Sequence, residues 1–399
     1  MTAEFVLGLG GCVDVEVDWD TAVLQQLVDE YRVATGEASH EIEVRDERDL
    51  VASILGFLRA GRGGERFVAA SDIVERFAAR FTNRFALGGT AVRAGLAMAK
   101  LGFPSALHLV SIDDNVRRLL PPECSYICSA VGDSLDPHLI VQYPPGTRIR
   151  CSDGDIVTPQ PNRLIYVNDR PNREMRLSPE LPQLLAGARV FLLASLNTMQ
   201  DERLLRSRLR QVRADTRHLP KGALVVHEDA AYHRPQLRAV VREGLAGIVD
   251  VHGMNEDELQ SYLRRSVDLL DPDDVCSALV ELRQTINAPT VVVHTQHWAL
   301  TAGRDAARFA PALRGGITMA ATRYRCGDGF SADDYQRTAT LTPMPAAADS
   351  AAEITRRSGG TICALPAPAV AVDQPTTVGL GDAFVGGFIC SLPSYLRGE

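Results

Sequence analysis

The fold of this chain is decided near its C-terminus, by the stretch Val378-Gly379-Leu380-Gly381-Asp382-Ala383-Phe384-Val385-Gly386-Gly387-Phe388. Two glycines followed by a run of small and apolar residues predict a tight turn that leads into a helix. Glycines let successive backbone N–H groups turn toward one point, and the positive end of the following helix adds to their field. The turn therefore predicts an anion site, where Asp382 could accept a proton from an attacking hydroxyl group.

Taken alone, this stretch has a second interpretation that involves no chemistry. A strand-to-helix turn often uses Gly for a positive φ angle and Asp as a helix N-cap. For an isolated Gly-x-Gly-Asp that structural interpretation is favoured over the catalytic one. The rest of the sequence must decide between the two.

Composition narrows the class of protein. The chain has 399 residues, of which 45% are hydrophobic, so it is long enough for one large domain with an insertion. A net charge of −8 gives no support for a nucleic-acid partner. The eight cysteines include no Cys-x-x-Cys pair, which favours reduced thiols over zinc ligands or disulfides. No apolar run is long enough to span a bilayer, so we expect a cytoplasmic protein with no membrane partner.

Short apolar runs alternate with amphipathic helical stretches along most of the chain. This pattern is typical of an α/β fold with a doubly wound, mainly parallel sheet. The predicted buried strands are 5–9, 106–110, 189–193, 223–226, 247–251 and 290–293. The predicted helices are 90–101, 201–215, 256–263 and 274–286.

The region 121–168 differs from the rest of the chain. It contains short β segments at 126–129, 139–143, 148–151 and 163–167, separated by Pro and Gly turns. This pattern predicts an inserted β-rich lid subdomain. We therefore expect a large nucleotide-binding domain from residues 1–14, 86–118 and 168–399, and a lid from residues 15–85 and 119–167.

Two features predict a substrate site at one edge of the sheet. Asp14 follows the first predicted strand, and open α/β sheets bind ligands at the ends of their strands. Its two oxygens could accept hydrogen bonds from two hydroxyl groups, although a turn carboxylate is the alternative. Gly88-Gly89 precedes a predicted helix, where its amides could bind a hydroxylated ligand or serve only a tight turn.

Two acidic stretches follow neighbouring predicted strands. Residues 227–229 read His-Glu-Asp, and residues 255–258 read Asn-Glu-Asp-Glu. Their oxygens could hold a Mg²⁺ ion that bridges nucleotide phosphates. Each stretch is also a good helix N-cap with acids in the first turn, which is the structural alternative.

A third candidate is His294-Thr-Gln-His297-Trp298, just past the predicted strand 290–293. Two histidines three residues apart suggest a metal site, but no third ligand lies nearby in the sequence. The alternative is that a histidine and an aromatic side chain here form the wall of an adenine site.

In their order along the chain, these motifs resemble those of the ADP-dependent sugar kinase family, the branch of the ribokinase-like superfamily with ADP-dependent glucokinases and phosphofructokinases. The motifs that carry the resemblance are Asp14, Gly88-Gly89, Pro159-x-x-Asn162-Arg163, residues 193–200, His227-x-Asp229-x-Ala231, Asn255-x-x-Glu258, Val293-His294-Thr295 and Gly379-x-Gly381-Asp382. The resemblance spans most of the chain and implies a ribokinase-like fold with a lid.

The resemblance also implies a role for each motif. Asp382 would be the general base, and the amides of Gly379, Leu380 and Gly381 would form the anion hole for the transferred phosphoryl group. Arg163 would bind the phosphate charge, and His294 would contact the nucleotide. The sugar would be bound by Asp14, Gly88 and Gly89, and Mg²⁺ by Asp229, Asn255 and Glu258.

Departures from the family pattern keep other functions open. Asp229 stands where the family has Glu, and Gly10 to Val13 replace an Asn-rich approach to the first Asp. We expect a Mg²⁺-dependent kinase that uses ADP and a sugar or sugar phosphate. An ATP-dependent ribokinase-type carbohydrate or nucleoside kinase, and an inactive ligand-binding homologue, are the alternatives. Both a monomer and a dimer fit the sequence.

Overall fold

The computed structural model describes residues 3–372 and 376–393, and its centre is a nine-stranded sheet. The strand order is β16-β15-β14-β13-β12-β11-β1-β5-β6. The strands from β14 to β6 are all parallel, whereas β15 pairs antiparallel with both β14 and β16. Their bounds are β1 (Phe5–Gly8), β5 (Ser105–Leu109), β6 (Cys124–Cys128), β11 (Val190–Leu193), β12 (Leu224–Glu228), β13 (Val251–Asn255), β14 (Thr290–His294), β15 (Trp298–Gly303) and β16 (Ile362–Pro366).

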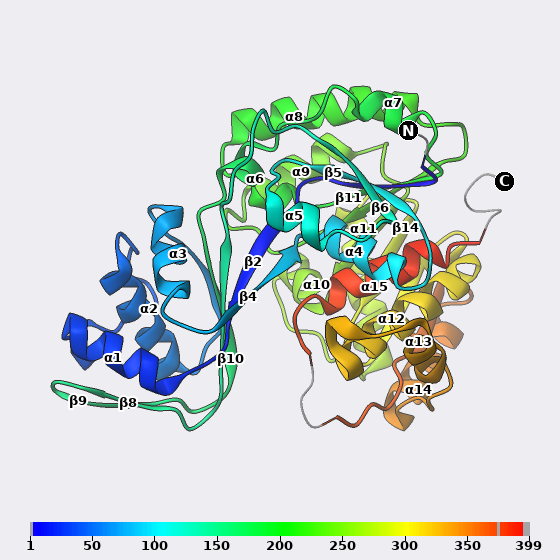
Figure 1. Cartoon of the computed structure of the whole chain (residues 1–399). Helices are drawn as coiled ribbons and strands as arrows, with labels where there is room; N and C mark the ends of the chain where they lie inside the picture. The colour runs from blue at the N-terminus through cyan, green and yellow to red at the C-terminus, as the bar shows by residue number, and fades with distance from the viewer. Residues whose placement is uncertain (1–2, 373–375, 394–399) are drawn as a thin grey trace.

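Helices cover both faces of this sheet, so the predicted doubly wound, mainly parallel α/β architecture is confirmed (Figure 1). One apolar core lies under α7 (Leu181–Leu185), α8 (Glu202–Asp215), α9 (Leu237–Leu245), α10 (Glu256–Leu263), α11 (Pro272–Thr285) and α14 (Pro345–Arg357). The other lies under α4 (Thr90–Ala99), α5 (Asp114–Leu119), α12 (Ala310–Cys326) and α15 (Leu380–Cys390). Two further α-helices of this part of the chain are α6 (Arg170–Glu174) and α13 (Ala332–Ala339).

A smaller five-stranded sheet lies beside the large one, with the strand order β3-β10-β7-β2-β4. Its own apolar core is covered by three helices, α1 (Thr21–Tyr31), α2 (Glu47–Ala60) and α3 (Ser71–Ala78), drawn in blue in Figure 1. The strands are β2 (Cys12–Val17), β3 (Gly64–Phe67), β4 (Asn83–Gly88), β7 (His138–Tyr143) and β10 (Asn162–Val167). A separate hairpin, β8 (Arg148–Cys151) and β9 (Gly154–Val157), packs beside α1 and α2.

Two predicted strands require correction. The segment 126–129 does not join the β-rich insertion, because β6 pairs in parallel with β5 at the edge of the large sheet. The short α5 makes the crossover between them, and its single buried apolar residue, Val116, gave little helical pattern to detect. The predicted strand 247–251 is also wrong. Gly247, at a φ of 77°, forms a turn, and β13 begins only at Val251.

Asp14 also lies elsewhere than predicted. It does not end the first strand but sits inside β2, which pairs with β4 and β7 of the small sheet. The strands β2, β3 and β4 were not predicted, since no tight hairpin connects any of them to its partner. Their pairing brings together residues that are far apart in the chain, and short-range periodicity does not detect this.

Buried histidines make the stability of this fold sensitive to acid. His108 on β5 is fully buried and accepts a hydrogen bond from the Ser178 amide at 2.9 Å. Burial lowers the pKa of His108 from 6.5 to about 4. The unfolded chain therefore takes up this proton first, so the stability contributed by neutral His108 is present above pH 6.5 and is lost as the pH falls toward 4.

We expect His108→Gln to cost less unfolding free energy at pH 4 than at pH 7, because glutamine does not take up the proton. The difference should reach up to about 3 kcal/mol, because the pKa of His108 falls from 6.5 in the unfolded chain to about 4 in the folded one. Urea unfolding at a series of pH values measures it, with His40→Gln as the control. A cost that does not change with pH would show that His108 titrates normally in the folded protein.

Candidate active site

The Gly-x-Gly-Asp stretch forms a turn and the uncapped start of α15. The N-cap is Gly379, with a φ of 70°, and no side chain of residues 3–372 or 376–393 accepts a hydrogen bond from the first amides of the helix. A side chain at position 379 would be strained, and its Cβ would lie 2.7 Å from Arg93 Nη1. Asp382 is the third residue of the helix and does not cap it, so the N-cap interpretation of this carboxylate is wrong. The helix N-terminus is therefore open to an anion.

Contacts on both sides hold this turn in place. The buried Arg323 on α12 donates from Nε to the Val378 carbonyl at 2.8 Å and also pairs with Asp328. On the other side, the Phe384 ring of α15 stacks on the His294 ring, with 4.6 Å between their centroids. The position of the anion site is thus fixed by a helix of the large core and by the end of β14.

Asp382 faces an arginine that sequence reasoning missed. Arg93 on α4 is buried, and its Nη2 donates to Asp14 Oδ2 at 2.6 Å. Its Nε lies 3.9 Å from Asp382 Oδ2. Burial opposes the charge of Arg93, but the Asp14 and Asp382 carboxylates outweigh it and raise the pKa above its usual range. The one available signal was an arginine within a helix of small and apolar residues.

A second arginine approaches from the small sheet. Arg163 on β10 is half-buried, and burial and the like charge of Arg93 lower its pKa. Among the nearby acids, Asp382 does most to oppose this lowering of the Arg163 pKa, so the guanidinium lies in the electric field of Asp382. In the part of the chain that the structure describes, this guanidinium has no hydrogen-bond acceptor. Arg163 is thus a half-buried cation with unused donors, close enough to Asp382 to interact with its charge.

The predicted sugar ligands lie next to this centre, but Asp14 is not a free carboxylate. One of its oxygens accepts from Arg93, and the other accepts from the Cys12 thiol at 3.4 Å. Gly88 ends β4, and a Cβ there would meet the side chains of Asp14 and Cys12, so close packing requires a glycine at this position. Gly89 is the N-cap of α4, with a φ of 89° and no capping side chain.

The predicted metal ligands lie at the ends of β12 and β13, but they differ in how many of their side-chain oxygens already accept hydrogen bonds. Asp229 is buried, and its two oxygens accept from the Ala230 amide at 2.9 Å and from the Tyr262 hydroxyl at 2.5 Å. Burial opposes its charge, but His252 and His227 lower the pKa of Asp229 to about 2. This carboxylate is therefore ionised and already occupied.

Asn255 and Glu258 form a capping box at the start of α10, as the structural alternative predicted. The Asn255 side chain accepts from the Glu258 amide at 3.0 Å, and Glu258 Oε2 accepts from the Asn255 amide at 2.9 Å. Burial raises the pKa of Glu258 to about 7, with Glu228 as the largest of the nearby charges. Glu228, which was not among the predicted ligands, lies 2.8 Å from His294 Nε2. Glu228 and Glu258 thus form a pair of buried carboxylates at this edge.

We expect Glu258→Gln to raise the concentration of Mg²⁺ needed for half-maximal activity, since the variant loses an oxygen charge beside bound phosphates. The glutamine carbonyl can still accept from the Asn255 amide, so the helix cap is retained. Asp257→Asn is the matched control, because Asp257 is exposed in the same helical turn. A metal titration identical in both variants would leave Glu258 with its capping role alone.

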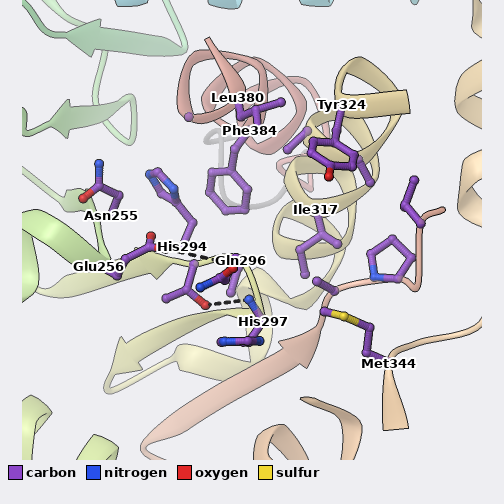
Figure 2. A pocket seen from close by; sticks show the side chains of 18 residues that line it. Asn255, Glu256, His294, Gln296, His297, Ile317, Tyr324, Met344, Leu380 and Phe384 are labelled. Atoms are coloured by element: carbon purple, nitrogen blue, oxygen red, sulfur yellow. Dashed lines mark hydrogen bonds between the residues drawn. The ribbon is translucent and has the colours of Figure 1, made fainter. Parts of the chain in front are cut away.

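A cavity of about 480 Å³ extends from the start of α15 (Figure 2). Leu380 and Gly381 line the end near the anion site, together with Asn255, Glu256 and His294. Figure 2 shows Phe384, Tyr324, Ile317 and Met344 around the remainder, with His297 on the same side as Gln296. Polar groups at one end and flat or flexible apolar groups at the other suit a ligand with an anionic part and an aromatic ring.

Trp298 does not form a wall of this cavity, contrary to the prediction. It is fully buried, and its Nε1 donates to the Leu269 carbonyl at 2.6 Å. Tyr324 and Phe384 line the cavity instead. No local pattern indicates this, because α12 and α15 meet only in the folded chain. His294 lines the cavity, and its role in nucleotide binding stays a prediction.

Three comparisons with known proteins bear on this site. Residues 3–389 match the family model described as the ADP-specific Phosphofructokinase/Glucokinase conserved region. Among curated protein sequences, none matches this chain.

The helices of residues 3–372 and 376–393 include none with the length and apolar character of a membrane span.

Solved structures share the whole fold at low sequence identity. A phosphofructokinase from Pyrococcus horikoshii OT3 with AMP is 18% identical, with a TM-score of 0.80 and 100% of both chains covered. The last common ancestor of ADP-dependent phosphofructokinases from Methanosarcinales is 15% identical, with a TM-score of 0.76, covering 98% of this chain and 94% of that one. An ADP-dependent kinase complex with fructose-6-phosphate and ADPbetaS is 15% identical, with a TM-score of 0.72, covering 98% and 93%.

Proposed function

The chain belongs to the ADP-specific phosphofructokinase/glucokinase family, and from this we propose that it transfers the terminal phosphoryl group of ADP to a hydroxyl group of a sugar or sugar phosphate. The observation that carries the proposal is the uncapped start of α15, with Asp382 in its first turn and the cavity beside it. Open amides at a helix N-terminus stabilise the negative charge of a phosphoryl group during its transfer. A carboxylate within the same turn can receive the proton of the attacking hydroxyl.

The nucleotide occupies the cavity in this proposal. Its adenine ring lies among the apolar groups around Tyr324 and Phe384, and its phosphates reach the amides of Gly379, Leu380 and Gly381. The cavity volume of about 480 Å³ is within the usual range of small-molecule sites, about 300–1,000 Å³. His294 closes the phosphate end and is itself held by Glu228.

The acceptor approaches from the small sheet. Arg163 donates to the oxygens of the transferring phosphoryl group, since its guanidinium has unused donors and lies in the field of Asp382. Asp14, Gly88 and Gly89 lie on the acceptor side, where Arg93 holds Asp14 in place. Most of the rate enhancement then comes from positioning and electrostatics, as in other phosphoryl transfers.

A Mg²⁺ ion fits the oxygen donors at the ends of β12 and β13. Glu258 Oε1 and the second oxygen of Glu228 are the carboxylate atoms left over by the hydrogen bonds there. Asp229 supports a metal less well, because both of its oxygens are engaged. When bound, such an ion would neutralise phosphate charge during the transfer. We place it at Glu258 and Glu228, with Asn255 orienting Glu258.

The small sheet and α1–α3 form the lid in this proposal. The chain passes between the lid and the large part from β1 to β2, from β4 to α4, from β6 to β7 and from β10 to α6. Glu65 and Phe67 on β3 both meet His233 of the large part: Glu65 Oε1 lies 3.3 Å from its Nε2, and the Phe67 and His233 rings are 4.5 Å apart. Closure of this lid would exclude water and so suppress hydrolysis of the nucleotide.

A matrix of two donors and several acceptors tests the proposal. The purified chain is assayed with ADP or ATP against glucose, fructose 6-phosphate and a panel of sugars and nucleosides. Turnover with ADP and a sugar supports it. Turnover with ATP but not with ADP would identify the chain as a ribokinase-type kinase. Nucleotide binding without turnover on any acceptor would indicate an inactive homologue.

A further inference from the structure

Three side chains with metal-binding atoms meet where the strands β2 and β7 of the small sheet begin. They are Cys12 and Asp14 on β2 and His138 on the neighbouring strand β7, and one ligand atom from each lies within 4.8 Å of the others. The parallel pairing of β2 with β7 sets Asp14 directly opposite His138. We infer that these residues form a zinc site with a thiolate, an imidazole and a carboxylate ligand.

The distances fit the geometry of tetrahedral zinc. With Zn–S about 2.3 Å and Zn–N or Zn–O about 2.0 Å, the ligand atoms of such a site are about 3.3–3.5 Å apart. Cys12 Sγ lies 3.4 Å from Asp14 Oδ1, and His138 Nδ1 lies 3.8 Å from the same oxygen. Only small side-chain shifts are needed to bring all three atoms onto one ion.

The surroundings orient the imidazole as metal sites do. His138 Nε2 lies 3.0 Å from Asp169 Oδ2, which leaves Nδ1 directed at Cys12 and Asp14. Asp169 is buried and is fixed by Asn172, whose amide donates to Oδ1 at 2.9 Å and whose Nδ2 donates to Oδ2 at 2.6 Å. A carboxylate behind a ligating histidine fixes its ring and raises its basicity.

Space and solvent access also allow an ion here. A Cβ at Gly88 would lie 2.6 Å from Cys12 Sγ and from both oxygens of Asp14, so the missing side chain is what makes room for these ligand atoms. Cys12 and His138 are partly exposed, which gives an ion a route in and leaves a fourth position for water or a ligand. A thiolate with an imidazole selects zinc over the hard ion Mg²⁺.

The site also shares Asp14 with the acceptor side of the proposed active site. Zinc on Asp14 Oδ1 would restrict the acceptor, and this consequence rests on the proposed function. Zinc would then raise the apparent KM for the sugar and leave that for ADP unchanged. Binding of the ion is measured without either substrate, so failure of the zinc site and failure of the kinase assignment are distinguishable.

The test uses the whole chain after removal of metals with a chelator. Zn²⁺ is titrated against a chromophoric chelator, and Co²⁺ is titrated by absorption spectroscopy. We expect one ion per chain, with a thiolate-to-cobalt charge-transfer band and the intense d–d bands of tetrahedral Co²⁺. Cys12→Ser and His138→Gln should each weaken zinc binding at least about a hundredfold, since each removes one of three protein ligands. Cys276→Ser, at a partly exposed thiol on α11, is the control.

Two results would overturn the inference: unchanged zinc affinity in Cys12→Ser, or a Co²⁺ spectrum without the thiolate band. If a variant fails to fold, alkylation of the parent chain gives the same decision. Zn²⁺ should slow iodoacetamide labelling of Cys12, located by peptide mapping, and leave labelling of Cys276 unchanged. Equal labelling of Cys12 with and without Zn²⁺ contradicts the site.

Discussion

Asp382→Asn is expected to lower kcat at least about a hundredfold while the dissociation constant for ADP stays within about twofold. The carboxylate contacts no capping amide, so its replacement by an isosteric amide leaves α15 and the turn at Gly379 in place. The change removes the only acid in the first turn of α15, and asparagine cannot take up the proton of the acceptor hydroxyl. Initial rates at saturating substrates and nucleotide titration by calorimetry measure the two quantities.

The matched control is Asp349→Asn, because Asp349 is exposed on α14, which covers the opposite face of the large sheet from α15. It should leave both constants unchanged. Near-normal kcat in Asp382→Asn would remove Asp382 as the base. A loss of kcat that accompanies a comparable loss of thermal stability would instead assign the aspartate a structural role, which its lack of hydrogen bonds within the described chain argues against.

Arg163→Ala is expected to lower kcat by at least about a hundredfold, the second of the large effects. The side chain offers free donors to the phosphoryl oxygens, and those contacts strengthen as charge moves onto these oxygens. Arg163→Lys should recover part of the rate, because it restores the charge but not the fork of donors. Steady-state kinetics on the three proteins separates the contributions of charge and of geometry.

Arg170→Ala controls for the loss of an arginine elsewhere. Arg170 is exposed at the start of α6 and pairs with Glu174 at 2.6 Å, so its removal should not change kcat. An Arg163→Ala enzyme with normal kcat and a raised KM for the acceptor alone would place Arg163 in substrate binding and not in the transfer step. Equal rates in all four proteins would exclude it from the site.

Local patterns predicted the elements that rest on local physics. The turn at Gly379 and Gly381 was recognisable because glycine at a positive φ and the small residues of α15 are features of short stretches of sequence. The helix at 256–263 was recognised from its acidic first turn, and the structure begins and ends α10 at the same residues. The parallel strands of the large sheet were recognised as short apolar runs, apart from the displaced β13 and from β6, which was predicted as a strand of the lid.

Features that depend on distant pairing were missed. β2, β3 and β4 were missed because their partners are far away in the chain. The salt bridge between Arg93 and Asp14 joins residues that are 79 positions apart, and no spacing rule reports it. The Cys12, Asp14 and His138 cluster is invisible to a search for paired cysteines for the same reason. The choice between Glu228 and Asp229 depended on side-chain direction at the end of β12, which composition does not encode.

The most direct measurement is the stoichiometry of products formed from ADP. The chain is incubated with Mg²⁺, ADP and one acceptor at a time, and AMP and phosphorylated sugar are quantified by ³¹P NMR. Transfer from ADP predicts one AMP for each phosphorylated sugar, with AMP formation dependent on the acceptor and lost in Asp382→Asn. The absence of AMP from ADP with every sugar tested, alongside phosphorylated sugar and ADP formed from ATP, would contradict it.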